Sequence, residues 1–206
     1  MNDIGSTGIA AIPLFVSFLL IGASASTIMI EDTDSIALDA KQTLNDTINE
    51  ITTYLKIEDV IGKYYVTNGV RSVEKIVIYI KQFFRNTINM SEVTIKISNN
   101  NDVILLDYSG HAVESNSKAV FEHQVWETTN NAFSLIVIFD KDRSLLDYNI
   151  MNEDTAFIAI KLPDQFVMEK DDTITISIIP AKGIIRSIVL ETPSFHSSNI
   201  ISFGGA

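Results

Sequence analysis

The sequence predicts an α+β chain, in which a long N-terminal hydrophobic helix precedes an antiparallel β-sheet head. Two observations indicate this. No charged residue occurs between Ile4 and Ile30, and the apolar pattern continues at helical spacing beyond that segment. After Ile61 the apolar period changes to alternation, which is typical of half-buried strands. We therefore expect a helical region at 1–60 and a head domain at 61–206.

The composition limits which partners and which kinds of chemical site are expected for this chain. The 206 residues include 26 acidic and 15 basic side chains, which gives a formal net charge of -11. Such a charge disfavours nucleic acid and anionic membrane surfaces as partners of the head. Without cysteine the chain has no disulfide, thiolate metal site or cysteine nucleophile. The three histidines, His111, His123 and His196, are scattered, so a histidine-based site would require the fold to gather them.

The charge-free segment from Ile4 to Ile30 is long enough, as a helix of roughly 40 Å, to cross a bilayer. Three interpretations stay open at this point: a cleaved secretory signal, a permanent membrane anchor, or the core helix of a polymer. Gly22 to Ser26 imitates a signal cleavage site, but no basic residue precedes the apolar run. The pattern beyond Ile30 indicates that the same helix continues instead.

In that continuation one apolar stripe follows helical spacing to about Val60. Its residues are Ala37, Leu44, Ile48, Ile51 and Leu55.

Small side chains alternate with large ones in the apolar segment, which favours close helix-to-helix packing. They are Gly8, Ala10, Ala11, Ser17, Gly22, Ala23, Ser24, Ala25 and Ser26. Pro13 interrupts the backbone hydrogen bonds of a helix unless it lies in the first turn. We therefore expect the regular helix either to begin near Ile12 or to bend at Pro13.

The remaining two-thirds of the chain contains seven β-rich runs, separated by short segments of turn-forming residues. The runs are Val73–Lys81, Glu92–Ser98, Asp102–Gly110, Phe133–Asp140, Asp154–Pro163, Asp171–Pro180 and Ile184–Pro193. Short strands at this spacing, without helical patterns between them, predict an antiparallel β-sandwich or barrel. Of these we expect an immunoglobulin-like β-sandwich head.

Few residues suggest site chemistry. Asp140 and Asp142, with Asp147 nearby, have the alternate spacing of the first ligands of a calcium loop. The segment lacks the glycine and the further oxygen ligands of such a loop, so we expect a solvated turn, as at Asp171-Asp172. The chain has no phosphate loop, zinc-binding helix or nucleophile elbow. We expect neither a metal nor a cofactor, and we expect no catalysis.

Two triplets match the acceptor sequence for N-glycosylation, at Asn45 and Asn89. Asn89 is the better candidate, because it lies in a predicted connection, whereas Asn45 would be available only on an exposed helix face.

The N-terminal segment and the strand order together resemble archaellin, the archaeal flagellin that builds the archaellum filament. Gly5, followed by Ser6-Thr7-Gly8-Ile9, has the glycine spacing found around the end of the family's signal. The run "GIAAIPLFVSFLLIGASASTIMI" is similar to the family's polymerising helix. In the head, "FSLIVIFDKDRSL" and "IIPAKGIIRSIVLETPS" resemble the central strand and the closing strands. The tail from Ser194 to Ala206 is either an extra strand or a contact between subunits.

This resemblance implies a structural subunit of an extracellular helical filament on the archaeal surface, used for swimming. It implies a type IV pilin-like helix, processing at Gly5 or Gly8, and a precursor that is membrane-inserted. The expected partners are copies of the chain, other archaellins, a prepilin-type peptidase and an ATPase-driven assembly platform, with no nucleic acid. The expected filament-core residues are Ile9, Ile12, Leu14, Phe15, Phe18, Leu19, Ile21, Ile28 and Ile30.

Two alternatives remain. The chain could be a membrane-anchored, stator-like accessory protein whose head binds the surface layer, or an adhesive type IV-like pilin. Abundance in sheared surface material would separate a filament subunit from an anchor.

Overall fold

A computed structural model describes residues 4–67, 69–82, 86–116, 119–195 and 198–205. Within the N-terminal helix, the side chains are described at positions 13–24, 26, 27, 33 and 35–48. Contacts divide the chain into two units, Met1–Ile48 and Asn49–Ala206. Each unit is described below by itself.

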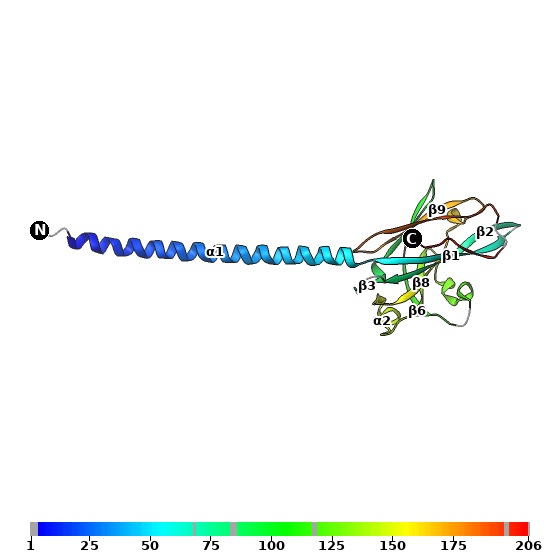
Figure 1. Ribbon diagram of the computed structural model, residues 1–206, viewed down its shortest axis with the longest axis horizontal. Helices are drawn as coiled ribbons and strands as arrows, with labels where there is room; N and C mark the ends of the chain where they lie inside the picture. Colours follow the sequence, from blue (N-terminus) through cyan, green and yellow to red (C-terminus); the bar gives the residue numbers. More distant parts are fainter. Residues whose placement is uncertain (1–3, 68, 83–85, 117–118, 196–197, 206) are drawn as a thin grey trace. The chain divides into compact units, whose positions relative to one another are not determined.

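Helix α1 extends over Ile4–Thr52 (Figure 1). Pro13 therefore lies inside the helix, and the expected alternative of a start near Ile12 is wrong. Within the part of the chain that the structure describes, no helix is both long and apolar enough to span a membrane.

The predicted continuation of the helix to Val60 is also wrong, because strand β1 covers Leu55–Thr67. Leu55, the last residue of the proposed helical stripe, is 1% exposed in the core of the head. Pairing of β1 with β2 along nearly its whole length outweighs the local helical pattern.

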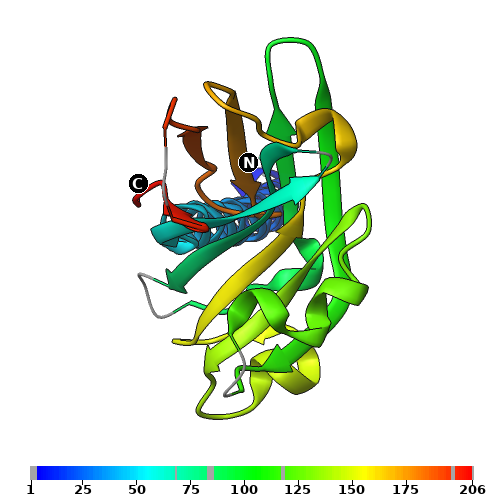
Figure 2. The same ribbon diagram turned by 90° about the vertical axis from the view of Figure 1, so that its right-hand side faces the viewer.

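The head contains one nine-stranded sheet with the order β10-β9-β4-β5-β6-β8-β2-β1-β11. Figure 2 shows the curl of this sheet. Neighbouring strands are antiparallel except β5 and β6, which run parallel. The remaining strands are β2 (Val70–Gln82), β4 (Thr94–Ser98), β5 (Val103–Glu114), β6 (Ala132–Phe139), β8 (Thr155–Lys161), β9 (Thr173–Ile179), β10 (Arg186–Glu191) and β11 (Ile200–Ser202).

The α+β class and the mostly antiparallel head are confirmed. The immunoglobulin-like sandwich is not confirmed, because continuous hydrogen bonding joins the nine strands into one sheet. Strands β3 (Ile88–Asn89) and β7 (Ile150–Met151) form a separate pair, and α2 covers Ser144–Tyr148. Alternation in a sequence predicts which face of a strand is buried, but not which strands pair.

The main core lies on one face of the sheet and includes Ile57, Ile76, Ile78, Phe133 and Ile158. Strand β2 is buried on both faces, since Val77, between Ile76 and Ile78, belongs to a second cluster.

This second cluster forms where the connection from β5 to β6 crosses the opposite face, which we call the outer face. Parallel neighbours need such a crossover. The connection contains the short helices η2 (Val120–Glu122) and η3 (Gln124–Glu127). Their Phe121, Val125 and Trp126 pack with Val77, Ile136 and Ala159.

The C-terminal tail adds a strand, which confirms the first of its two predicted alternatives. β11 pairs antiparallel with β1, and Phe203 N donates to Val60 O at 2.8 Å. Gly62 permits this close approach, because a Cβ there would lie 2.9 Å from Val73 Cγ1 and 3.0 Å from Phe203 Cε2. The tail thus adds a short edge strand to the sheet of the head.

Candidate functional site: an apolar helix and polar sites on the head

A run of large apolar side chains is exposed on α1. Leu14, Phe15, Phe18, Leu19 and Ile21 are between 57% and 67% exposed in the single chain. Their spacings place them on adjacent helix faces, and Val16 (46% exposed) and Leu20 (64% exposed) extend the apolar surface around the axis. An exposed apolar surface of this kind marks a site of association.

The small polar residues of this segment do not present free hydroxyl groups. Ser17 donates to the Pro13 carbonyl at 2.7 Å, and Ser26 donates to that of Gly22 at 2.8 Å. Ser24 and Thr27 make the same bond, four residues back, to Leu20 and Ala23. Because each hydroxyl is satisfied within the helix, these residues permit close packing without an unpaired polar group.

Gly22 also leaves room for a neighbour. A Cβ added at this position would meet no atom within 4 Å, so nothing else in the described chain fills that space.

Part of the predicted site lies outside this description. Gly5 and Gly8 belong to α1, and their role in processing stays a prediction. The side chains of Ile9, Ile12, Ile28 and Ile30 are not among the described ones, so their place in a filament core also stays a prediction.

Three carboxylates of the head come together between β6 and β8. Asp140, Asp142 and Asp154 each offer an oxygen, and these oxygens lie within 4.8 Å of one another. Asp140 Oδ2 accepts hydrogen bonds from the backbone of Leu145 (3.1 Å) and Leu146 (3.0 Å), which fixes it at the start of α2. Asp140 Oδ1 and Asp154 Oδ1 are buried and have no hydrogen-bond partner in the described chain.

The environment pushes two of these pKa values apart. Hydrogen bonds from Ser144 and Asn152 lower the pKa of Asp142 to about 2. Burial, together with the charges of Asp140 and Asp142, raises the pKa of Asp154 to about 6, although a backbone hydrogen bond from Asn152 opposes this shift. Oxygen ligands with unused acceptors are what a hard divalent cation requires, so these three residues could hold one.

The sequence predicted only a solvated turn at Asp140 and Asp142, and Asp154 was not expected to join them. Asp154 is visible in the sequence as the last residue of the turn "MNED". Its side chain reaches the cluster only because α2 and β7 fold back between Asp142 and Asp154. Asp147 lies outside the cluster and pairs with Arg143 at 3.4 Å.

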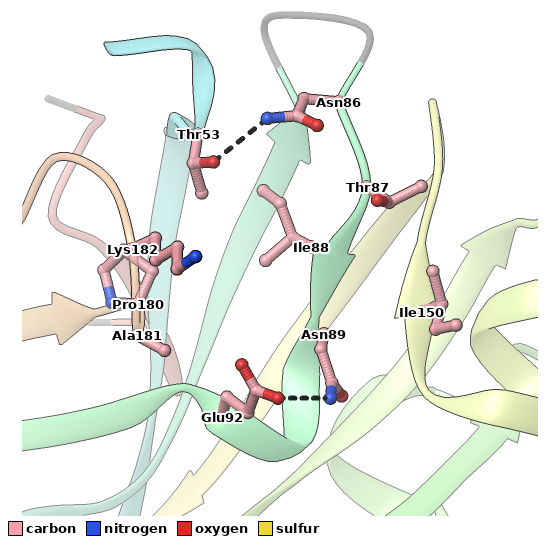
Figure 3. A pocket seen from close by; sticks show the side chains of 10 residues that line it. All are labelled: Thr53, Asn86, Thr87, Ile88, Asn89, Glu92, Ile150, Pro180, Ala181 and Lys182. Atoms are coloured by element: carbon pink, nitrogen blue, oxygen red, sulfur yellow. Dashed lines mark hydrogen bonds between the residues drawn. The ribbon is translucent and has the colours of Figure 1, made fainter. Parts of the chain in front are cut away.

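Asn89 lies beside a pocket of about 250 Å³ in the head (Figure 3). Its Oδ1 accepts from Ser91 N at 3.1 Å, and its Nδ2 donates to Glu92 Oε1 at 3.0 Å. Asn89 therefore caps the short helix η1 (Met90–Glu92). Asn45 is exposed on α1. Both side chains are accessible, and their glycosylation stays a prediction.

The described histidines do not suggest a reactive site. His123 is 4% exposed, its Nδ1 accepts from Val125 N at 3.3 Å, and its Nε2 lies 3.2 Å from the Glu114 carbonyl oxygen. These backbone contacts give His123 a structural role in the crossover. His111 is exposed on β5, and His196 lies outside the described residues.

Solved structures of two filament proteins resemble this fold, each with a TM-score of 0.63. The crystal structure of archaeal flagellin FlaB1 from Methanocaldococcus jannaschii has 18% identity, and the match covers 73% of this chain and 96% of that chain. The archaeal flagellum of Methanospirillum hungatei strain JF1 has 13% identity, with coverage of 96% and 97%.

A third structure, the archaellum periplasmic stator protein FlaG from Sulfolobus acidocaldarius, has 14% identity and a TM-score of 0.38, with coverage of 67% and 99%. The family model for archaeal-type flagellin matches residues 5–190. With an exposed apolar helix, a curled β head and a family match over nearly its whole length, this chain belongs to the archaeal-type flagellin family.

Proposed function

We propose that this chain is a structural subunit of the archaellum, an extracellular helical filament on the cell surface that serves swimming. Membership of the archaeal-type flagellin family supports a structural filament protein rather than an enzyme. The observation that carries the proposal is the exposed apolar run from Leu14 to Ile21 on α1. Its partners are copies of the chain itself or other archaellins.

The exposed run supplies the driving force for assembly. Burying one large apolar side chain contributes about 1.5–3 kcal/mol, so association of several such helices outweighs the loss of subunit freedom. Contacts between different surfaces of successive copies do not close on themselves, and they extend into a helical polymer. In this arrangement α1 forms the filament core and the acidic heads keep the polymer soluble.

The earlier steps of assembly are inferred from the same family. We propose that a prepilin-type peptidase cleaves at Gly5 or Gly8, that the precursor is membrane-inserted, and that a membrane assembly platform transfers it into the filament. The start of the mature chain, read by mass spectrometry of sheared filaments, tests the cleavage step.

The stator-like anchor and the adhesive pilin are not favoured, because the matching family is that of flagellins. An anchor would remain in the membrane fraction at low copy number, whereas a filament subunit dominates sheared surface material.

Phe18→Asp tests the core-helix proposal. Phe18 is 67% exposed in the single chain, so the substitution does not disturb the described subunit. In a packed apolar core, however, an unpaired carboxylate costs several kcal/mol. We expect filaments to be absent by electron microscopy, while thermal unfolding of the head is unchanged.

Two variants serve as controls. Phe18→Leu keeps an apolar side chain and should preserve filaments, and Val103→Asp places the same charge on an exposed position of β5. Wild-type filament yield from Phe18→Asp would contradict the proposal.

A further inference from the structure

Three lysines lie side by side on neighbouring strands of the sheet, on its outer face. Lys63 on β1 is paired with Lys75 on β2, and Lys75 is paired with Lys161 on β8. We call these residues the lysine row. Like charges directly opposite each other weaken a sheet. In a chain with 26 acidic and only 15 basic residues, the row is a local reversal of the overall charge.

Aromatic rings hold two of the three ammonium groups. Lys75 Nζ lies 5.0 Å from the centre of the Trp126 ring and 5.4 Å from that of Tyr65. Lys63 Nζ lies 5.6 Å from the Tyr65 ring centre and 6.0 Å from that of Phe121. A ring face attracts a cation without neutralising it. The rings therefore position the charges but leave them available to an anion.

Nearby carboxylates balance the row only in part. Glu122 Oε1 lies 4.0 Å from Lys63 Nζ, with a side chain that is 68% exposed. Lys161 Nζ donates only to Asn130 Oδ1, at 3.4 Å, and neither Lys75 nor Lys161 forms an ion pair in the described chain.

The pKa of Lys75 reflects this surplus of positive charge. Burial lowers the pKa, and the charges of Lys63 and Lys161 lower it further, whereas Glu74 raises it.

The Tyr65 hydroxyl is a second unsatisfied group at the same place. Its oxygen is buried and has no hydrogen-bond partner in the described part of the chain. A buried hydroxyl without a partner costs free energy. Ammonium groups donate to a carboxylate, whose two oxygens accept from more than one of them.

We propose that the lysine row binds a carboxylate side chain of a second copy of this chain. This inference rests on the proposed function, because the polymer is what brings a second copy into fixed contact. Each copy carries a net charge of -11 and therefore presents mainly carboxylates to its neighbours. In a single subunit the three lysines repel one another, whereas in the filament each is attracted to the carboxylate of the neighbouring copy. The row therefore becomes favourable only when the subunits assemble.

Substitution of Lys75 should therefore have opposite effects on the subunit and on the filament. In dissociated full-length subunits, Lys75→Gln removes repulsion and should raise the unfolding temperature or leave it unchanged. In filaments at low salt, it should speed subunit release about tenfold, which corresponds to roughly 1.4 kcal/mol. Lys75→Arg keeps the charge and should release subunits at nearly the wild-type rate.

Lys96→Gln is the matched control, because Lys96 lies on β4, away from the row. It should change neither measurement. Filaments of Lys75→Gln that release subunits at the wild-type rate would overturn the inference.

Zero-length carbodiimide cross-linking of sheared filaments identifies the occupant. Covalent dimers are separated from monomers, which retain intramolecular links such as one between Lys63 and Glu122. We expect dimers in which a lysine of the row is joined to an Asp or Glu of another copy. Dimers linked only through other lysines overturn the inference, and a row lysine linked to a sugar acid assigns the site to a glycan instead. Absence of wild-type filaments would overturn the proposed function itself, which separates the two failures.

Discussion

Asp154 carries a carboxylate that the fold buries completely, with an Oδ1 atom that has no hydrogen-bond partner in the described chain. Its neighbours Asp140 and Asp142 add like charge within 4.8 Å. A buried acid among acids is costly unless a proton or a cation balances it. The fold keeps this arrangement at the connection between β6 and β8, where oxygen ligands are already fixed by backbone hydrogen bonds.

We expect calcium to stabilise the head through these three residues. At about 100 times its dissociation constant, a bound ligand adds about 2.7 kcal/mol to the free energy of unfolding. Thermal unfolding of dissociated full-length subunits, with calcium or with a chelator, measures the effect. Asp154→Asn should remove most of the calcium response and should stabilise the cation-free head, because it no longer buries an unbalanced charge.

Asp171→Asn provides the control, since Asp171 is an exposed acid in another turn. An equal calcium response in Asp154→Asn and the wild type would exclude the cluster as the binding site.

At the residue scale, a side chain could be assigned from the sequence where its neighbours along the chain define its role. It could not be assigned where its role depends on residues that only the fold brings near. The apolar run from Leu14 to Ile21 could be predicted, because absence of charge is visible without a fold. The pairing of Lys63, Lys75 and Lys161 could not, because it depends on the register of three strands.

At the element scale, β1 shows why a local pattern is insufficient. Leu55 fits a helical stripe with Ile48 and Ile51, and it also begins a strand in which alternate residues are buried. Twelve residue pairs with β2 decide in favour of the strand, with two register shifts. The parallel pairing of β5 with β6 could likewise not be predicted, since the helices in the described part of the crossover between them are short.

The short helix η1 depends on its N-cap, Asn89. Substitutions at the two glycosylation triplets test this capping role. Asn89→Gln removes the cap on Ser91 N and should lower the stability of the head by about 1 kcal/mol. Asn45→Gln alters the other glycosylation triplet on an exposed face of α1, and it should leave the unfolding temperature of the head unchanged. Mass spectrometry of the wild type and of both variants reports whether either asparagine carries sugar, because the variant that lacks a modified asparagine loses the mass of the glycan. Equal effects of the two substitutions on head stability would contradict the capping role.

At the scale of the whole molecule, β10 and β11 are the two edge strands of the nine-stranded sheet. β11 covers β1 with only three paired residues, although Ile201 is 5% exposed and belongs to the main core. The neighbouring Ile200 is 51% exposed. Within β11, Ile201 is therefore the buried side chain, and with the partly buried Phe203 beside it, it anchors the strand that shields β1 from pairing with other chains.

Ile201→Asn and Ile200→Asn compare two faces of this strand. The first should cost about 1.5–3 kcal/mol of stability and should promote aggregation, because loss of the buried side chain frees the edge of β1. The second should change stability by less than about 0.5 kcal/mol. Thermal unfolding with light scattering measures both, and comparable aggregation of the two variants would remove the basis for this role of β11.

The pairing of β11 with β1 also concerns the timing of biosynthesis. Strand β11 closes onto β1, the first strand of the head, so the sheet is complete only after translation has passed Ser202. A nascent or prematurely terminated chain would present a bare strand edge to quality-control proteases.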